Sequence, residues 1–222
     1  MKTTSRKKAS KTKISRQNTS TTPRADTKRL EIIVAAAAVF AEHGYANTTM
    51  NMIAKRLDWH TAGLYYYFEN KDALVEALLR YTSHRLANEA NKALDELGDA
   101  APLDRVKTMI RSHAMTVMRG DSVGTAYQKI YKQVSPELQA HTLDAPRAFA
   151  RLWQGVIDEA VESGDLRGDI SARLLRLLLL GSIAWIPDWF KPKGPNSPEE
   201  ISDALVALFL EGARARPDTT RP

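Results

Sequence analysis

The feature that most restricts the fold of this chain is the spacing of its apolar residues, which recur every three or four positions along most of the sequence. Leu30, Ile33, Ala37 and Phe40 begin this pattern, and it continues as far as Phe209. The interval is that of one face of an α-helix. No segment shows the alternation of apolar and polar residues that is typical of a half-buried strand, so the sequence predicts an all-α protein.

Glycine, proline and helix-capping residues divide the pattern into separate helices. Gly44 ends the first helix, while Thr48-Thr49, Asn70 and Ser135-Pro136 are typical helix beginnings. We expect helices over about residues 29–43, 49–57, 60–67, 71–97, 106–119, 127–134, 136–163 with a break near Pro146, 169–186 and 198–212. The sequence therefore predicts a group of short helices followed by longer ones.

Positive charge is concentrated at the beginning of the chain. Residues 1–24 contain eight Lys and Arg residues and no acidic residue, and subtracting these charges from the formal net charge of +6 leaves −2 for residues 25–222. Because so polar a segment buries too little surface to offset its ordering entropy, we expect a disordered basic arm at 1–23, and a short disordered tail at 214–222. The arm suits phosphate contact, although an arm that only aids solubility has the same composition.

Composition and motifs exclude several classes of protein. The chain has no Cys, and its densest apolar run, Leu174 to Leu180, is far shorter than the ~20 residues of a membrane span. Residues 1–23 lack the apolar stretch of a signal peptide, so we expect a cytoplasmic protein. No GxGxxG, GxxxxGK[ST], HExxH or GxSxG motif occurs, and no two His residues are four positions apart. We expect no enzyme, no metal site and no cofactor.

Two short helices joined by a tight turn, with a longer helix bracing them, place one helix in the DNA major groove. Residues 29–79 fit this arrangement. Thr48 and Thr49 offer hydroxyls and free amides at the N-terminus of the second helix, where the helix dipole stabilises a phosphate. The predicted base-reading positions lie on the first turn of the third helix and are His60, Thr61, Gly63 and the small Ala62, which allows close approach.

These segments together resemble the N-terminal signature of the TetR/AcrR family of transcriptional regulators. The matching segments are Ile33 to Tyr45, Thr48-Thr49-Met50, Ile53-Ala54, Leu64 to Phe68 and Asn70 to Leu74. The resemblance implies a three-helix helix-turn-helix DNA-binding domain at 24–70 and a helical effector-binding and dimerisation domain at 71–213. It also implies a homodimer that binds palindromic double-stranded DNA, usually as a repressor.

The resemblance extends to an aromatic cluster at the end of the third helix. Of Tyr65, Tyr66 and Tyr67, some must pack inward, and the family pattern implies that Tyr66 and Tyr67 face DNA and that Lys71 contacts a phosphate. An aromatic stripe that merely fills a core is the alternative. The chain departs from the family in having Asp58 where the turn usually has Gly, and His60 and Gly63 where Ser and Thr are familiar. These differences leave the fold intact but prevent any inference about the operator sequence.

The C-terminal half offers candidates for effector binding, since Met adapts to irregular shapes and Tyr combines apolar surface with a polar tip. The segment from Gly181 to Pro192 resembles a subgroup of TetR regulators that respond to acyl-coenzyme A thioesters, although Ala184 replaces the usual Asn before the first Trp. An acyl-coenzyme A or lipid-like small molecule is therefore the expected effector. The candidate residues are His113, Met118, Tyr127, Tyr131, Trp153, Trp185 and Trp189. Met118, Tyr127, Tyr131 and Trp153 fit a plain core equally well, and a lone His is more often a hydrogen-bonded core residue.

The helix from Leu174 to Ile186 is apolar on nearly all sides and must be covered on all of them. A second copy of the chain is the economical cover, and an ordinary central core helix is the alternative. In a dimer, the effector would favour a spacing of the two recognition helices that differs from one DNA turn, ~34 Å. The competing functional hypothesis is a helical interaction module whose basic arm binds nucleic acid or an acidic partner without sequence preference.

Overall fold

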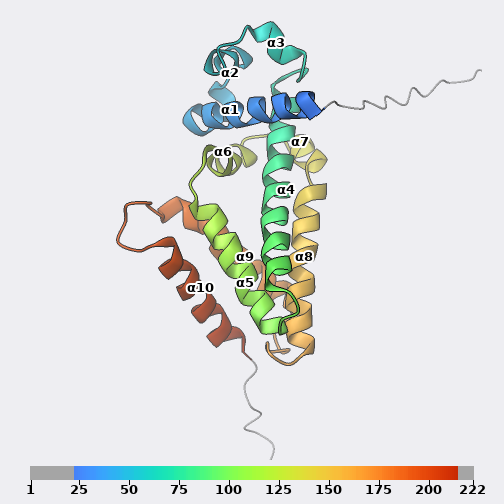
Figure 1. Cartoon of the computed structure of the whole chain (residues 1–222), viewed down its shortest axis with the longest axis vertical. Helices are drawn as coiled ribbons and strands as arrows, with labels where there is room; N and C mark the ends of the chain where they lie inside the picture. The colour runs from blue at the N-terminus through green and yellow to red at the C-terminus, as the bar shows by residue number, and fades with distance from the viewer. Residues whose placement is uncertain (1–22, 215–222) are drawn as a thin grey trace, which may run out of the picture.

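The computed structural model describes residues 23–214, and over this range the chain forms ten α-helices and no β-strand. Figure 1 shows α2 and α3 at one end of the molecule, α1 and α6 below them, and α4, α5 and α8 running towards the other end. The prediction of an all-α fold is confirmed. The bounds are α1 (Pro23–Asn47), α2 (Met50–Arg56), α3 (Thr61–Tyr65), α4 (Lys71–Leu97), α5 (Pro102–Met118), α6 (Ser122–Tyr131), α7 (Pro136–His141), α8 (Asp144–Glu162), α9 (Ala172–Trp189) and α10 (Pro198–Ala213).

Several helices begin where the sequence places a capping side chain. The side chains of Thr49, Asn70 and Ser135 each accept a hydrogen bond from an amide in the first turn of α2, α4 and α7. Ser197 does the same for α10 and forms a reciprocal capping box with Glu200. Each cap satisfies an amide that has no partner within its helix. These boundaries are therefore fixed locally.

The two ends of the described range differ from the expected bounds. Pro23, placed by the sequence in the basic arm, is the first residue of α1, and the other residues of that arm lie outside the described range. At the C-terminal end, Arg214 forms a backbone bridge with Leu166, and residues 215–222 lie outside the description. The arm and the tail therefore remain predictions for residues 1–22 and 215–222.

Proline did not break two helices where the sequence suggested a break or an early end. Pro146 lies in the first turn of α8, where a missing amide is tolerated, and the break falls at residues 142–143 instead. Likewise α9 continues through Pro187 to Trp189 instead of ending at Ile186. Within the described range, no helix combines the length and apolar composition that a bilayer span requires.

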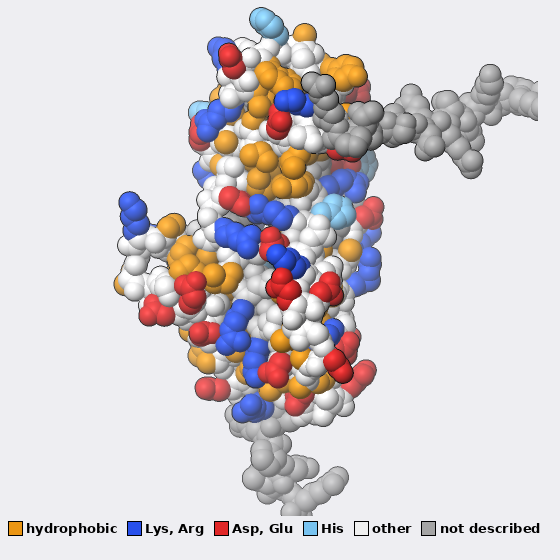
Figure 2. Space-filling view, viewed as in Figure 1, with side chains coloured by type: hydrophobic (Ala, Val, Ile, Leu, Met, Phe, Trp, Pro, Cys, Tyr) orange, Lys and Arg blue, Asp and Glu red, His pale blue; other side chains and the backbone are white. Residues whose placement is uncertain are grey.

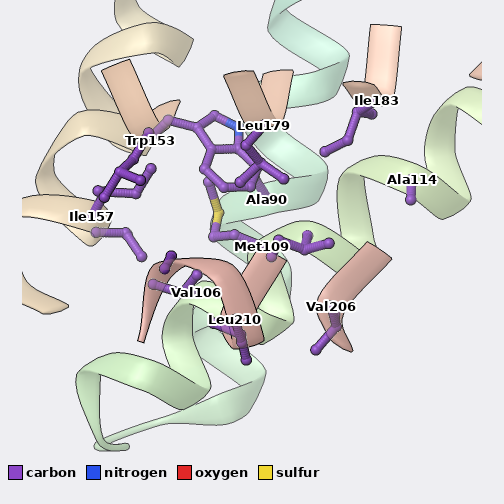
Figure 3. Packing of buried hydrophobic residues seen from close by; sticks show 14 of the residues in the cluster. Ala90, Val106, Met109, Ala114, Trp153, Ile157, Leu179, Ile183, Val206 and Leu210 are labelled. Carbon is purple, nitrogen blue, oxygen red and sulfur yellow. The ribbon is translucent and has the colours of Figure 1, made fainter. Parts of the chain in front are cut away.

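Two apolar clusters hold the helices together. The first joins α1, α2 and α3 to the beginning of α4 and also includes Val123, Ala126 and Ile130 of α6. The second, drawn in Figure 3, fills the space among α4, α5, α8, α9 and α10. Because α6 follows α5 in the chain but completes the first cluster, the N-terminal core does not end at residue 70. Packing thus connects the short-helix unit to the longer helices.

The turn between α2 and α3 depends on an unusual backbone conformation. Asp58 has φ 56°, and it is the one non-glycine residue in the described range with a positive φ. A side chain in this region costs ~1–2 kcal/mol, and Asp and Asn are the residues that tolerate it best after Gly. Asp58 therefore serves in the place where a glycine is usual.

We predict that Asp58→Val lowers the free energy of unfolding by about 1–2 kcal/mol, because a β-branched side chain is strained at positive φ. Asp58→Asn is the matched control, since it removes the charge but tolerates the same conformation. Urea unfolding of both variants measures the difference. Equal stabilities for Val and Asn at this position would contradict the backbone argument.

Candidate DNA-binding surface and effector core

Helix α3 is held in the molecule by one buried side chain and exposes most of the rest. Leu64 is fully buried, whereas Tyr65 is 52% and Tyr66 84% exposed. His60, at the N-cap, and Ala62, in the first turn, are exposed as well. The anchor fixes the position of the helix, and its exposed end presents polar and aromatic groups to the surroundings.

The first turn of α3 is tied to α2. The Thr61 hydroxyl donates a hydrogen bond to Asn51 Oδ1 over 3.3 Å, and the Trp59 amide donates to the carbonyl of Ala54 over 2.9 Å. A Cβ on Gly63 would lie 3.6 Å from Trp59, an ordinary contact distance. Asn51 is exposed and was missed by the sequence analysis, because only the folded turn brings it beside Thr61.

Two of the predicted DNA-contacting residues are turned inward. The Thr48 side chain is buried, and its hydroxyl donates to the Gly44 carbonyl over 2.7 Å. Tyr67 is partly buried, with its ring 6.2 Å from that of Trp59 and 5.0 Å from that of Tyr66. Thr48 thus stabilises the turn before α2, and it is Tyr65, rather than Tyr67, that shares the surface with Tyr66.

Lys71 contacts backbone carbonyls at the end of α1. Its Nζ donates to the carbonyls of Tyr45 and Thr48 over 2.8 and 3.1 Å and lies 4.2 Å from the Tyr45 ring centre. The Tyr45 hydroxyl donates to Asp72 over 2.5 Å, and this bond, with burial and the charge of Asp72, raises the pKa of Tyr45 to about 12. An ammonium group has three donors, so one N–H of Lys71 is left for another acceptor.

Helix α6 and Gln133, which follows it, form hydrogen bonds to the same end of α1. The Tyr45 amide donates to Gln133 Oε1 over 2.9 Å, and Lys129 Nζ donates to the Ala41 carbonyl. Gly44 has φ 73°, and a Cβ there would come within 3.2 Å of Gln133. Glycine is therefore favoured by its conformation, and a side chain there would also press on the end of the Gln133 side chain. The kink at Gly44 in α1 is thus stabilised by contacts from α6 and Gln133.

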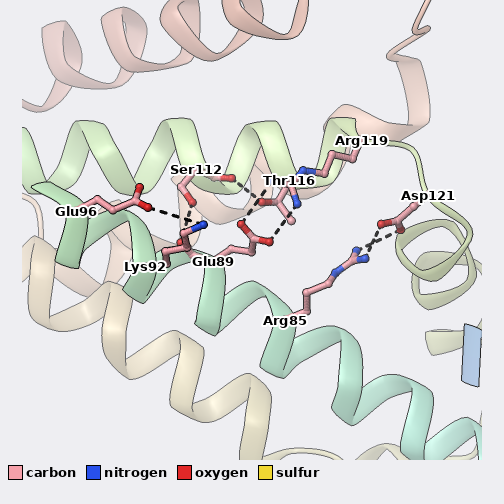
Figure 4. Close-up of polar contacts among 8 residues, drawn as sticks. All are labelled: Arg85, Glu89, Lys92, Glu96, Ser112, Thr116, Arg119 and Asp121. Atoms are coloured by element: carbon pink, nitrogen blue, oxygen red, sulfur yellow. Dashed lines mark hydrogen bonds and ion pairs between the residues drawn. The ribbon is translucent and has the colours of Figure 1, made fainter. Parts of the chain in front are cut away.

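Ion pairs connect α4 to the segment between α5 and α6 (Figure 4). Arg85 makes two hydrogen bonds to Asp121, the N-cap of α6, at 2.5 and 3.2 Å, and Arg119 reaches Glu89 at 3.1 Å. Burial raises the pKa of the Asp121 carboxyl, but the bonds from Arg85 and the Gly124 amide outweigh it and hold that pKa below its usual value. The start of α6 is therefore fixed to the middle of α4.

Three predicted effector residues lie together in the second apolar cluster. Trp153 is fully buried, Met118 is buried, and the His113 ring centre lies 6.0 Å from that of Trp153. Among the described residues, His113 Nδ1 and Trp153 Nε1 are buried and have no hydrogen-bond partner. Burial lowers the pKa of His113 to about 4. The expectation of a hydrogen-bonded core His is therefore not met at Nδ1.

The other predicted effector residues lie elsewhere. Tyr127 and Tyr131 stack on each other at 5.4 Å and pack against the first apolar cluster, away from Trp153. Trp185 and Trp189 are 63% and 47% exposed on α9. A surface hollow of about 320 Å³ on α4 contains none of the seven, being lined by Tyr81, His84, Arg85, Asn88, Glu89 and Lys92.

Helix α9 carries an exposed apolar stripe in the single chain. Leu178 is 59% exposed, and Trp185 follows it at the helical interval on the same side. Leu208 is an exposed apolar residue of α10. Figure 2 shows apolar side chains gathered beside the segment that joins these two helices. The described part of the single chain therefore leaves one side of α9 uncovered, as a helix that packs against a second copy would be. The large exposed members on α9 are Leu174, Leu177, Leu178, Trp185 and Trp189.

Comparison with known proteins covers both halves of the chain. Residues 32–78 match the family described as bacterial regulatory proteins of the tetR family, and residues 99–213 match the tetracycline repressor-like C-terminal domain. The second match alone spans more than half of the chain. The helix-turn-helix unit and the long-helix domain thus belong to one known architecture.

The relatives are named regulators. The chain is 26% identical to the HTH-type transcriptional repressor KstR2 of Mycolicibacterium smegmatis, over 83% of this chain and 90% of that protein. It is 21% identical to the fatty acid metabolism regulator protein of Bacillus subtilis, over 83% and 95%. The solved structure of AibR in complex with isovaleryl coenzyme A and operator DNA has the same fold, with TM-score 0.72 at 24% identity over 82% of this chain and 97% of AibR. This chain therefore belongs to the TetR family and is a DNA-binding transcriptional regulator.

Proposed function

We propose that the protein is a homodimeric repressor that binds a palindromic operator through α3 and is released by an apolar or acyl-coenzyme A-type effector. The observation that carries this proposal is the surface of α3, where one buried leucine anchors a helix whose remaining side chains are largely exposed. A braced, exposed helix of this kind is what major-groove recognition requires. Because bacterial DNA lies in the cytoplasm, a regulator of this family would act there.

The proposed DNA contacts are of two kinds. His60, Thr61, Ala62 and Gly63 would lie against base edges, since they form the start of α3. Contacts to phosphate position the protein without reading sequence, and these would come from Thr49, Tyr65, Tyr66 and Lys71. Thr48 and Tyr67 are left out of the contact set, because their side chains are used inside the fold. Asn51 is added beside Thr61.

The proposed effector class rests on the apolar interior and on the named relatives. One relative is the fatty acid metabolism regulator protein of Bacillus subtilis, and AibR was solved in complex with isovaleryl coenzyme A. The cluster around Trp153 is built from apolar residues of five helices, including Met109 and Met118, whose flexible side chains adapt to irregular shapes. An apolar molecule entering this cluster would displace the helices that surround it.

The effector signal would reach α3 by way of α6. Displacement of α5 would pull on Arg119 and Asp121, which are bonded to α4, and thus on the first turn of α6. Helix α6 in turn contacts the end of α1 through Lys129, and Gln133, just after the helix, contacts it as well. Effector and operator would then favour different arrangements of the same helix, so that the binding of one weakens the binding of the other.

Selection of random duplex DNA by the purified protein at ~150 mM salt, followed by sequencing, tests the proposal. A two-fold symmetric motif is the expected result, and it also supplies the probe for effector screening. Failure of a folded dimer to enrich any motif would remove sequence-specific repression. It would favour the interaction module with a basic arm, whose affinity should fade uniformly with salt for all sequences.

We predict that Lys71→Met has two separable effects. Loss of the bonds to two carbonyls should lower the free energy of unfolding by about 2 kcal/mol. Loss of a phosphate contact should also reduce the slope of log affinity against log salt concentration by about 1. The control is Lys92→Met, which removes an exposed charge paired with Glu96 and should alter neither quantity much. A reduced stability with an unchanged slope would show that Lys71 serves the fold alone.

A further inference from the structure

The most unusual feature of the long-helix domain is a pair of buried nitrogen atoms without partners. Trp153 is fully buried, and within residues 23–214 neither its Nε1–H nor His113 Nδ1 has a hydrogen-bond partner. Folded proteins pair nearly all buried polar atoms, because each unpaired one keeps the cost of losing its water. Two such atoms on neighbouring rings can be paired only by a group that the described part of the chain does not supply.

The two side chains come from different helices and meet at one place. His113 is on α5 and Trp153 on α8, and their ring centres lie 6.0 Å apart. Phe149 closes the group, with ring centres 5.1 Å from His113 and 6.5 Å from Trp153. Figure 3 shows the indole of Trp153 extending from α8 among residues of the apolar cluster.

The surroundings restrict the chemistry of the missing partner. The cluster around Trp153 consists of apolar residues, so a carboxylate or phosphate placed among them would lose its water at a large cost. Burial keeps the pKa of His113 near 4, and the imidazole is therefore uncharged at neutral pH. Indole N–H is a donor only, whereas a neutral imidazole nitrogen donates or accepts. An uncharged oxygen satisfies both atoms.

We propose that Trp153 and His113 form the polar recognition point of the effector site, and that the effector is a largely apolar molecule whose uncharged carbonyl or hydroxyl oxygen binds between them. This deepens the proposed function, on which it rests, by naming the group that distinguishes an effector from a plain hydrocarbon. The phosphates of a coenzyme A thioester do not fit this point, and only its acyl part does. Met109 and Met118 would adjust to the apolar body of the ligand.

The test uses three ring compounds of similar shape as probes, namely cyclohexanone, cyclohexanol and cyclohexane. The full chain contains four Trp residues, so their indole N–H signals are few enough to follow by two-dimensional ¹H–¹⁵N NMR and to assign by single Trp→Phe replacements. We expect cyclohexanone and cyclohexanol to move the Trp153 signal downfield, as a new hydrogen bond does, and cyclohexane to leave it unmoved. The measurement contains no DNA, so its failure and a failure to find an operator are distinguishable.

A matched pair of variants tests the part played by His113. His113→Phe keeps an aromatic ring but removes the nitrogen, and it should weaken cyclohexanone binding about tenfold, the effect of one lost hydrogen bond. His84→Phe makes the same change at an exposed position of α4 and should have no effect. The proposal is overturned if neither oxygen-bearing probe moves the wild-type Trp153 signal, or if cyclohexane moves it equally. Unchanged cyclohexanone affinity in a folded His113→Phe protein would overturn the pairing of the two residues.

Discussion

Ala62→Glu should abolish operator binding while leaving the fold unchanged. Ala62 is exposed on the first turn of α3, so a longer side chain meets no neighbour inside the protein. On the operator, the new carboxylate would face base edges and phosphates at the position of closest approach. Like charges brought together at an interface cost several kcal/mol, and each 1.4 kcal/mol is a factor of ten. We therefore expect an affinity loss of at least ~100-fold, measured by fluorescence anisotropy with the selected operator.

The matched control for this change is Ala148→Glu, which adds the same side chain at an exposed position of α8. It should leave operator affinity within about threefold of the wild type, because a single surface charge outside the helix-turn-helix unit is screened by salt. Thermal unfolding and circular dichroism of both variants should match the wild type. Equal affinities for the two variants would show that α3 is not the reading helix.

Leu178→Asp should convert the dimer into folded monomers. Leu178 is 59% exposed in the single chain, so the substitution leaves the chain's own core intact. In a two-fold dimer formed through α9 and α10, the carboxylate of each subunit would be buried without a partner. Because both subunits contribute the same residue to the interface, this cost is incurred twice. We expect the dimer to weaken by ~1,000-fold or more. Because a monomer presents only one α3 helix to the operator, its operator affinity should be lower by roughly two to four powers of ten.

Leu97→Asp is the control for dimerisation, since Leu97 is also partly exposed but ends α4 and lies on neither α9 nor α10. Analytical ultracentrifugation across a range of concentrations distinguishes the two variants. A dimer that survives Leu178→Asp but dissociates with Leu97→Asp would place the interface on the other side of the molecule. Survival of both would argue against an apolar interface on α9.

Much of the fold could be predicted because its signals are local. Thr49, Asn70 and Ser135 begin helices through bonds to amides three residues away, and Gly44 breaks α1 through its own φ. Asp58 occupies a left-handed turn because its short polar side chain tolerates it. Proline was a weaker guide, since Pro146 and Pro187 are accommodated within helices. Its effect depends on whether the amide it lacks was needed.

The candidate site was predictable only in part, because sequence spacing does not say which neighbour a side chain meets. Three adjacent tyrosines look alike in the sequence, yet Tyr66 is exposed and Tyr67 packs against Trp59. Thr48 and Thr49 look equally suited to contact a phosphate, but the Thr48 side chain is buried and its hydroxyl donates to the Gly44 carbonyl. Tyr127 and Tyr131, expected near an effector, belong to the core shared with α1, since α6 crosses to that side.

The sequence by itself determined the helical class, the helix-turn-helix unit and the apolar stripe of α9, because periodicity and capping act within a few residues of each other. Only the tertiary structure decided that Gln133, just after α6, contacts the end of α1. It also decided that His113 and Trp153 meet in one core, where one nitrogen of each has no partner among the described residues. These contacts join residues 88 and 40 positions apart. Helix packing angles fix them, and no local pattern in the chain encodes such an angle.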